Sequence, residues 1–387
     1  MTALHPATLL TWIADICALA ALAGVAYVLL NIALVLRLRK PTLLPVEPSQ
    51  VSVLVPLCGA EDGLYERLAA LCRQTYARDF EIICGALSAA DPALAVAHRA
   101  ARDFPHARLD VASDDREIGL NRKISNLSNM LTRARYETVV MLDSDIVVDD
   151  DYLSRIVAEL GQPGVGAVTS LYYGLSGAGI WSSLSSVAIN VHFLPNVISG
   201  LRLGMATPCF GATIALSRAL IEEVGGMSAF AGALHDDYAI GAAVRATGRK
   251  VAVSYGAVGH LCLERSAGEL WQSQLRRART IHAIDPIGNL GAAITHPFAL
   301  ALLAMALGAP DGPALVLAVV AARFAQCLCI DRVFGLKERG YWTLPLSDLL
   351  SFAAYLIAFI GGDVVWRGAR YKVALSGQLL PQVSTDA

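Results

Sequence analysis

Both ends of the chain are rich in long apolar runs, and the middle alternates between short apolar runs and amphipathic ones. The first apolar run is "ICALAALAGVAYVLLNIALVL", residues 16–36, in which Asn31 is the only strongly polar residue. About 20 consecutive apolar residues are enough to cross a bilayer as a helix. We therefore predict an N-terminal transmembrane anchor over residues 9–37.

Apolar runs return in the C-terminal third of the chain, at residues 297–308, 314–330 and 349–361. Glycine and proline between the first two runs predict a membrane hairpin. Arg323 lies in the second run, and an unpaired charge is costly in a membrane. We therefore expect it to face protein or to pair with a neighbour such as Asp331. The pattern predicts membrane segments over residues 292–366 and a basic tail over 367–387, and it leaves open whether the third run spans or lies flat.

One more apolar stretch lies inside the middle part, at residues 180–205. It is interrupted by Ser183, Ser185, Asn190, His192, Pro195 and Arg202. These residues make a comfortable membrane span less favourable than a helix that lies at the membrane interface. Such a helix would bring a lipid to a neighbouring active site.

Residues 50–285 have the composition of a soluble domain. Short β-branched runs begin near Val51, Phe80, Ala107 and Glu137, and they alternate with helix-like runs such as "GLYERLAALCRQTY". This alternation predicts an α/β domain whose parallel sheet carries helices on its faces. Ligands of such sheets bind beyond the carboxyl ends of the strands.

Composition and charge narrow the choice of function. Only 17% of the residues are charged and 55% are hydrophobic, as a membrane protein requires. Basic residues follow the first apolar run at Arg37, Arg39 and Lys40, and none precedes it, so we predict that the middle domain faces the cytoplasm. The eight cysteines form no CxxC pair, which indicates reduced thiols. The net charge of -2 argues against nucleic acid as a partner.

The stretch "VVMLDSDIVVDD" places Asp143 and Asp145 at the end of an apolar strand. Two carboxylates at this spacing can hold Mg²⁺ or Mn²⁺ together with a substrate phosphate, although on its own the motif could be a capped loop. The strand before it favours the metal site. The following residues Asp149, Asp150 and Asp151 have the pattern of a solvated helix start and cap.

Three further motifs carry candidate chemistry. Asp236 and Asp237 stand at a helix start, where they could be a cap or could include a general base. Lys123, in "GLNRKISNLSNML", could contact a phosphate, while Asn126 and Asn129 could bond a sugar or position the loop. The stretch "QSQLRRARTIH" could clamp a diphosphate or be only a positive-inside cluster.

Taken in order, "DPAL", "NRKISNL", "LDSDI", "FGATIALSR", "HDDYAIG" and "QLRRART" resemble the motifs of the inverting glycosyltransferases related to ceramide glucosyltransferase. "PLCGAEDGLYERL" and "ARTIHAIDPIG" most resemble the bacterial hopanoid-biosynthesis-associated branch. The resemblance covers nearly the whole chain. It implies a GT-A catalytic domain, with a Rossmann-like mixed sheet, on the cytoplasmic face of the membrane, which is the inner membrane in a bacterium. It also implies a UDP-sugar donor, a divalent metal and a lipid hydroxyl acceptor.

The resemblance also assigns roles to residues. Asp143 and Asp145 match the Asp-x-Asp that binds metal and diphosphate, Asp237 matches the general base, and Arg276 matches the arginine of a Gln/Arg-x-x-Arg-Trp motif. Two positions depart from the family pattern: Ser88 stands where an Asp often contacts the nucleotide base, and Arg277 replaces the tryptophan. The donor-binding candidates are Ser88, Asp91, Lys123, Asp143 and Arg276. The acceptor or supporting candidates are Asp236, His192, Gln272 and Arg277.

The expected function is that of a membrane-bound inverting glycosyltransferase. It would move N-acetylglucosamine or glucose from a UDP-sugar to a hopanoid polyol such as bacteriohopanetetrol or to ceramide. A processive polysaccharide synthase is an alternative, but it would need more transmembrane helices to form a channel. A catalytically silent membrane scaffold is another alternative, which the departures at Ser88 and Arg277 keep open. The oligomeric state cannot be predicted from the sequence.

Overall fold

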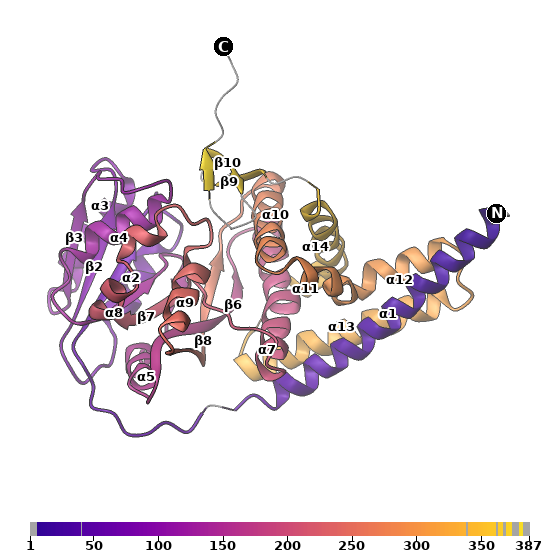
Figure 1. The fold of residues 1–387 in the computed structure, drawn as a ribbon, viewed down its shortest axis with the longest axis horizontal. Coiled ribbons are helices and arrows are strands. Elements are labelled where there is room, and N and C mark those ends of the chain that lie inside the picture. The colour runs from indigo at the N-terminus through magenta and orange to yellow at the C-terminus, as the bar shows by residue number, and fades with distance from the viewer. Residues whose placement is uncertain are drawn as a thin grey trace, which may run out of the picture. The chain divides into compact units, whose positions relative to one another are not determined.

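The computed structural model describes residues 6–39, 41–337, 340–360, 363–366, 369–373 and 379–381 (Figure 1). The chain divides into two compact units, each made from three separate stretches of sequence. We name them by their content. The helical unit comprises Met1–Leu38, Gly174–Ala206 and Glu264–Ala369. The sheet unit comprises Arg39–Tyr173, Thr207–Leu263 and Arg370–Ala387.

The helical unit is built from long apolar helices joined by short irregular turns. Its elements are α1 (Pro6–Leu36), α6 (Ile180–Ala188), the π-helix η1 (Ile189–Phe193), α7 (Leu194–Arg202), α10 (Ala267–Ile284), α11 (Pro286–Gly291), the 3₁₀ helix η3 (Ala292–Thr295), α12 (Pro297–Ala306), α13 (Gly312–Phe334), the 3₁₀ helix η4 (Gly340–Thr343), α14 (Leu344–Ala358) and the strand β9 (Asp363–Trp366).

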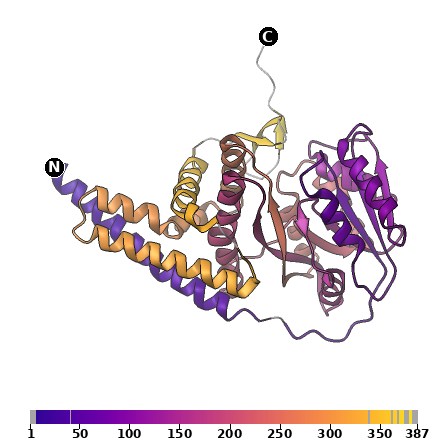
Figure 2. The same cartoon turned by 180° about the vertical axis from the view of Figure 1, so that it is seen from behind.

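Three helical segments of the described chain are long and apolar enough to cross a membrane. They are Leu9–Leu36, Ile180–Arg202 and Gly312–Phe334. A fourth candidate is a pair of short segments, Pro286–Thr295 and Pro297–Ala306, that meet at a bend of 65°. Helices α1, α12 and α13 lie side by side in both views and share an apolar core that includes Ala21, Ala301 and Val319 (Figures 1 and 2). The predicted anchor and C-terminal apolar helices are therefore present.

The stretch over residues 180–205 forms a helix, as predicted, and its polar residues do not interrupt it. Several of them are buried and hydrogen-bonded. Asn190, for example, accepts the Gly174 N–H at 2.7 Å and donates to the Gly174 carbonyl at 3.0 Å. Ile180–Arg202 is continuously helical and belongs to the helical unit, so the predicted domain limit at residue 285 falls inside that unit. Its position at a membrane interface stays a prediction.

Arg323 faces protein, as one of the two alternatives predicted, but its partner is not Asp331. Arg323 Nε lies 3.2 Å from Asp348 Oδ2, and these side chains are 3% and 2% exposed. His192 Nε2 lies 2.6 Å from the other oxygen of Asp348. Asp331 instead accepts a hydrogen bond from the Tyr341 hydroxyl. Arg323 pairs with Asp348 and not with its sequence neighbour Asp331 because α14 packs against α6, which brings Asp348 into the interior. We call Arg323, Asp348 and His192 the buried ion cluster.

The sheet unit is a mixed eight-stranded sheet with helices on both faces. Its strands are β1 (Val51–Pro56), β2 (Phe80–Ala86), β3 (Arg108–Ser113), β4 (Thr138–Leu142), β5 (Ile146–Val147), β6 (Val165–Ser176), β7 (Thr213–Ser217) and β8 (Lys250–Cys262), in the order β3-β2-β1-β4-β7-β6-β8-β5. The first four strands pair in parallel, whereas β7 pairs antiparallel with both β4 and β6. The predicted α/β class and the first four predicted strands are confirmed.

The remaining elements of this unit are helices and a short hairpin. The helices are α2 (Leu64–Cys72), α3 (Pro92–Asp103), α4 (Arg122–Leu131), α5 (Tyr152–Leu160), α8 (Arg218–Glu223), the 3₁₀ helix η2 (Met227–Phe230) and α9 (Asp236–Ala246). In the predicted basic tail, β10 (Ala369–Val373) pairs antiparallel with β11 (Leu379–Pro381). Residues 367–368, 374–378 and 382–387 of that tail lie outside the described residues.

Alternating side chains of the strands fill two separate cores, one on each face of the sheet. Val140 and Leu142 of β4 pack with α2, α3 and α5, while Val139 and Met141 pack with α4, α8 and α9. Successive strand residues point to opposite faces, so a strand covered on both sides must be apolar throughout. This explains why "VVML" shows no alternation, and why the first polar residue after it, Asp143, marks the carboxyl edge of the sheet.

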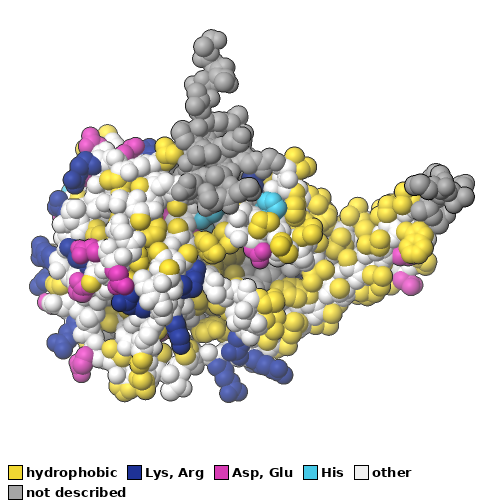
Figure 3. Space-filling view, in the orientation of Figure 1, with side chains coloured by type: hydrophobic (Ala, Val, Ile, Leu, Met, Phe, Trp, Pro, Cys, Tyr) yellow, Lys and Arg dark blue, Asp and Glu magenta, His cyan; other side chains and the backbone are white. Residues whose placement is uncertain are grey.

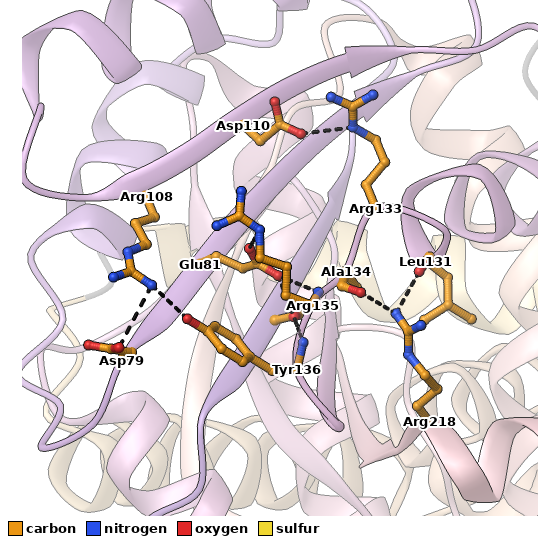
Figure 4. Close-up of polar contacts among 11 residues, drawn as sticks. Asp79, Glu81, Arg108, Asp110, Leu131, Arg133, Ala134, Arg135, Tyr136 and Arg218 are labelled. Carbon is orange, nitrogen blue, oxygen red and sulfur yellow. Dashed lines mark hydrogen bonds and ion pairs between the residues drawn. The ribbon is translucent and has the colours of Figure 1, made fainter.

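The opposite, amino edge of the parallel strands carries a set of ordinary ion pairs (Figure 4). Arg108 Nη1 donates to the Tyr136 hydroxyl at 2.7 Å, and Arg133 Nε lies 2.8 Å from Asp110 Oδ2. Glu81, which is 5% exposed, accepts the Arg135 N–H at 2.7 Å. Each of these acids has a basic or backbone partner, so this edge is electrostatically satisfied.

Candidate active site

Four carboxylates gather at the carboxyl edge of the sheet, all within the sheet unit. Asp143 directly follows β4, and Asp145 lies one residue before β5. Asp236 and Asp237 form the first turn of α9, where the helix dipole favours negative charge. We call these four residues the acidic cluster.

Lys123 is the cation that this cluster shares. Its Nζ lies 2.6 Å from Asp143 Oδ1 and 3.8 Å from Asp236 Oδ2. Lys123 reaches this position because Asn121 caps α4, accepting the Ile124 N–H at 3.1 Å. Asn121 also donates to Asp236 Oδ1 at 3.2 Å, so one helix start supplies both an ammonium and an amide to the acids.

Gly211 lies where side chains of the acidic cluster and Lys123 come close together. A methyl group added there would lie 3.1 Å from Lys123 Nζ, 3.3 Å from Asp143 Oδ2 and 3.6 Å from Asp237 Oδ2. The Gly211 N–H donates to Asp237 Oδ2 at 3.0 Å, and the Tyr238 N–H donates to Asp237 Oδ1 at 2.8 Å. Asp237 is therefore held in one orientation by two backbone groups.

Asp145 has a different environment from Asp143. Its carbonyl accepts the Leu261 N–H at 2.9 Å, which ties it to β8, and His260 Nδ1 lies 3.5 Å from its Oδ1. That oxygen is buried and makes no hydrogen bond. Arg67 donates to the carbonyl of the intervening Ser144, and it pairs with Glu61 at 3.1 Å. The backbone of the Asp-x-Asp turn is thus held in place by the buried side chain of Arg67.

The pKa values of the acids in this cluster shift in different directions. Partial burial raises the pKa of Asp237 to about 6, and the neighbouring Asp236 adds to the rise. Partial burial also raises the pKa of Asp143, against the effect of Lys123. Burial opposes ionisation of Asp145 as well, but His260, Lys123 and Arg67 together hold its pKa below the usual range. Asp145 is thus the stable anion, and Asp237 is poised to exchange a proton near neutral pH.

Several predicted residues of the sheet unit have structural contacts. Asp91 caps α3, accepting the Ala93 N–H at 2.9 Å, and it also accepts the Gly59 N–H. Exposed Ser88 accepts the Ala90 N–H at 3.2 Å. Asn126 donates to the Gly85 carbonyl, and Asn129 donates to the carbonyls of Asp114 and Arg116. Asn129 therefore positions the loop before α4, which was one of the two alternatives, whereas Asn126 ties α4 to the end of β2.

The predicted cap at residues 149–151 is only partly present. Helix α5 does begin after Asp151, but the Asp151 side chain caps no backbone N–H. Asp151 has φ -98° and ψ 8°, which is outside the extended conformation from which a capping side chain reaches back. It pairs instead with Arg155, one helical turn onward.

The remaining candidates belong to the helical unit. Arg277 Nη2 donates to Ser185 Oγ at 3.1 Å and to Ser273 Oγ at 2.9 Å, and it lies 3.7 Å from Glu264. His192 is part of the buried ion cluster. Gln272 is exposed on α10, which also carries Arg276. These contacts describe the helical unit alone, so their roles toward a donor or acceptor stay predictions.

Sequence reasoning did not single out His260, Arg67, Gly211 or Asn121. Gly211 and Asn121 lie inside motifs that carried the family resemblance, "FGATIALSR" and "NRKISNL". Arg67 was visible as a cation in the amphipathic run that became α2. The sequence around His260 did not indicate a role in the site, because His260 reaches Asp145 only through the antiparallel pairing of Ile146 with His260.

The model of the family described as "Glycosyl transferase family 21" matches residues 16–379, which is most of the chain. The chain belongs to glycosyl transferase family 21. The predicted family is confirmed. Ceramide glucosyltransferase 1 of Caenorhabditis elegans is 26% identical over 218 residues, which cover 56% of this chain and 46% of the relative. Ceramide glucosyltransferase of Komagataella phaffii is 30% identical over 128 residues, covering 32% and 25%. The chain thus spans about half the length of the first relative and less of the second.

The fold of this family 21 member also has a solved counterpart. A mannosyltransferase from Pyrobaculum calidifontis, solved with GDP-mannose and Mn²⁺, superposes with a TM-score of 0.57 at 20% identity. The match covers 91% of this chain and 99% of the solved one. This likeness concerns the fold, and it confirms the predicted GT-A class.

The metal that the family resemblance implies can be tested against the residues of the sheet unit. Among the described residues, no group of three or more His, Cys, Asp or Glu side chains is arranged to hold a metal ion. Asp145 and His260 nevertheless place two suitable donors 3.5 Å apart, and the Asp145 oxygen concerned is buried without a hydrogen bond. Divalent cations that act with nucleotides commonly take one or two protein ligands and complete their shell with phosphates and water. The donor set of this family 21 member fits that pattern.

Proposed function

We propose that this chain transfers a hexose from a UDP-sugar to the hydroxyl group of a membrane lipid, with inversion at the anomeric carbon. The observation that carries the proposal is the acidic cluster, in which four carboxylates lie together, Lys123 lies within 3.8 Å of two of them, Asp143 and Asp236, and Asp237 has a pKa raised to about 6. A satisfied structural cluster needs no such excess of negative charge. Membership of glycosyl transferase family 21 supports the same reaction class.

Asp237 is the proposed general base. It would accept the proton of the acceptor hydroxyl while that oxygen attacks the anomeric carbon from the face opposite the diphosphate. The bond from carbon to the acceptor oxygen forms as the bond to the diphosphate oxygen breaks, which is a single displacement with inversion. The backbone N–H groups of Gly211 and Tyr238 fix the carboxylate orientation, and a pKa near the working pH suits a base.

Asp145, His260 and Asp143 are the proposed residues that would hold a divalent metal, Mg²⁺ or Mn²⁺. When bound, such an ion supplies positive charge for the departing diphosphate. Lys123 holds Asp143 near the site through its 2.6 Å contact and favours its ionised form, against the effect of burial on its pKa. Lys123 would also offer its ammonium to a phosphate oxygen, and Arg276 of the helical unit is a second proposed phosphate contact. For the nucleotide base, Ser88 stays a candidate contact; the capping bonds of Asp91 favour a structural role for that residue.

Ceramide is the acceptor that the relatives support best, since both are named ceramide glucosyltransferases. A hopanoid polyol is the second candidate, supported by the motifs "PLCGAEDGLYERL" and "ARTIHAIDPIG". Glucose would accompany ceramide, and N-acetylglucosamine the hopanoid. Gln272, Arg277, His192 and Asp236 are proposed to position the acceptor or support the base. Cytoplasmic exposure of the sheet unit is part of the proposal, because Arg37 and Arg39 follow α1.

The test is an assay of membranes from cells that express the full chain. They are offered UDP-glucose or UDP-N-acetylglucosamine together with ceramide or bacteriohopanetetrol, and the lipid extract is analysed by mass spectrometry. A lipid adduct with one hexose or one N-acetylhexosamine that requires both substrates, and that falls at least about a hundredfold with Asp237→Asn, supports the proposal. No glycolipid from any combination would favour the silent scaffold, and a polymer in place of a single adduct would favour the processive synthase.

A further inference from the structure

The ends of three candidate membrane helices carry exposed cations, and they all lie at the same side of the helical unit. Arg37 follows α1, Arg202 ends α7, and Arg332 lies in the last turn of α13 with Lys337 just beyond it. All four residues are exposed. We call these four residues the basic rim.

Contacts between the helices bring the rim residues together. Arg202 Nη2 donates to the Arg37 carbonyl at 3.1 Å, which joins the ends of α7 and α1. Six residues earlier in each helix, Asn31 of α1 bonds Asn196 of α7 at 3.2 Å. Near the end of α13, Cys329 Sγ lies 3.8 Å from the carbonyl of Ile32 in α1. Both cartoon views show α1 and α13 ending at the same side (Figures 1 and 2).

Apolar side chains are exposed directly beside these cations. Leu36 is 57% exposed, Leu203 48% and Met205 73%. The loop that carries Leu203 and Met205 is well defined, because Gly204 has φ +69° and the Met205 N–H bonds the Gly200 carbonyl at 2.8 Å. This is the Schellman ending of a helix, so the two side chains are held outward. Helix α13 ends in the same way, with Gly335 at φ +68° and a 3.0 Å bond from the Leu336 N–H to the Asp331 carbonyl.

The charges are distributed unevenly along these helices. At the far end of α13 the charged residue is Asp311, and within α1 it is Asp15. The acid nearest the rim, Asp331, is engaged by the Tyr341 hydroxyl at 2.5 Å. In the space-filling view, dark-blue side chains gather at the end of α1, next to yellow apolar surface (Figure 3). The rim is therefore positive, and it directly borders the surface expected to face hydrocarbon.

We propose that the basic rim binds the headgroups of anionic phospholipids in the leaflet where α1, α7 and α13 end. Guanidinium groups suit phosphate oxygens, and the exposed Leu203 and Met205 would enter the interface beside them. The occupant is a lipid of the bilayer because the rim is continuous with the helices that have the length and apolarity to span it. This inference is independent of sugar transfer.

Native mass spectrometry of the full chain in detergent tests the proposal. The protein is equilibrated with equal amounts of phosphatidylglycerol and phosphatidylcholine, and the retained lipids are counted. The wild type should retain phosphatidylglycerol preferentially. Arg202→Gln with Arg332→Gln should lower that preference about 25-fold, because each cation near an anionic surface contributes about fivefold. Arg202→Lys with Arg332→Lys should keep most of it.

The matched control removes two exposed arginines from the sheet unit, Arg99→Gln with Arg133→Gln, and should leave the preference unchanged. Raising the salt from about 0.05 to 0.5 M should weaken the wild-type preference, which tests the charge dependence without any variant. Equal retention of the two lipids by the wild type would overturn the proposal. An equal loss in the control pair would overturn it as well. Neither result depends on whether the chain transfers a sugar.

Discussion

The acidic cluster and the buried ion cluster contain the same kinds of groups, and they use them in opposite ways. In the helical unit, one carboxylate, Asp348, is met by Arg323 at 3.2 Å and by His192 at 2.6 Å. In the sheet unit, four carboxylates lie together, and the Lys123 ammonium lies within 3.8 Å of two of them, Asp143 and Asp236. The difference teaches that a charge balanced within the protein serves the fold, whereas a charge left in excess awaits a ligand.

Arg323 also serves the irregular backbone of the helical unit. Its guanidinium donates to the Thr295 carbonyl at 2.7 Å, where the chain bends before α12, and to the Val191 carbonyl at 3.2 Å, within the π-helix η1. Backbone groups freed by a bend must find partners in an apolar environment. The buried ion cluster therefore stabilises the bent helices, and we expect its loss to affect folding.

The largest expected effect is on catalysis by the acidic cluster. Asp237→Asn should lower kcat by at least about a hundredfold, because the amide cannot accept a proton. The protein should stay folded, as judged by gel filtration in detergent and by circular dichroism. Normal turnover by a folded Asp237→Asn protein would exclude Asp237 as the base.

Asp145→Ala should also lower activity by about a hundredfold, through loss of charge stabilisation for the diphosphate. A second readout is direct binding of Mn²⁺ to the purified protein, followed by electron paramagnetic resonance without substrate, and this binding should weaken. Asp143→Ala should act in the same direction on activity. Unchanged Mn²⁺ binding by the Asp145 variant, or full activity after exhaustive chelation, would contradict the proposed metal role.

In the buried ion cluster the expected effect is on stability. Arg323→Met leaves Asp348 as a buried anion without its main partner and should lower the free energy of unfolding by about 3–5 kcal/mol. Adding Asp348→Leu should recover much of this loss, because no charge is then left unpaired. Denaturant unfolding in detergent, followed by tryptophan fluorescence, measures both. A double variant as unstable as the single one would show that the backbone bonds of Arg323, not its charge, dominate.

Lys123→Met sharpens the comparison by removing the one cation that the acidic cluster shares. Burial raises the pKa of Asp237 and Lys123 lowers it, so removal of Lys123 should raise that pKa further. The acid limb of the pH–activity profile should then move to higher pH, in addition to any loss in kcat. An unmoved limb would mean that Lys123 does not influence the base.

The smallest effect is expected at the amino edge of the sheet. Arg133 and Asp110 form an ion pair at 2.8 Å, but both side chains are about half exposed (Figure 4). Exposed pairs contribute roughly 0–1 kcal/mol. Arg133→Gln should therefore change the free energy of unfolding by less than about 1 kcal/mol and should leave activity unchanged. A larger change in either would show that the amino edge contributes more than its exposure implies.

Local patterns predicted the parts of the molecule that depend on local chemistry. The β-branched runs became β1–β4, and the Asp-x-Asp turn lies at the carboxyl edge because an apolar strand leads directly to it. Pairings between distant segments could not be predicted. His260 reaches Asp145 across an antiparallel ladder, and Asp348 reaches Arg323 because α14 returns to the interior. The partners of the polar residues at 180–202 could not be predicted either, because they lie in other elements, as Gly174 does for Asn190.

The pH dependence of kcat/KM for sugar transfer tests the central claim most directly. Asp237 is ionised and able to act as a base above its pKa of about 6, and it is protonated below it. The wild type should therefore lose activity about tenfold per pH unit below about pH 6, whereas the residual activity of Asp237→Asn should show no such limb. A wild-type profile that stays flat down to pH 5, or an acid limb that persists unchanged in Asp237→Asn, would contradict the account.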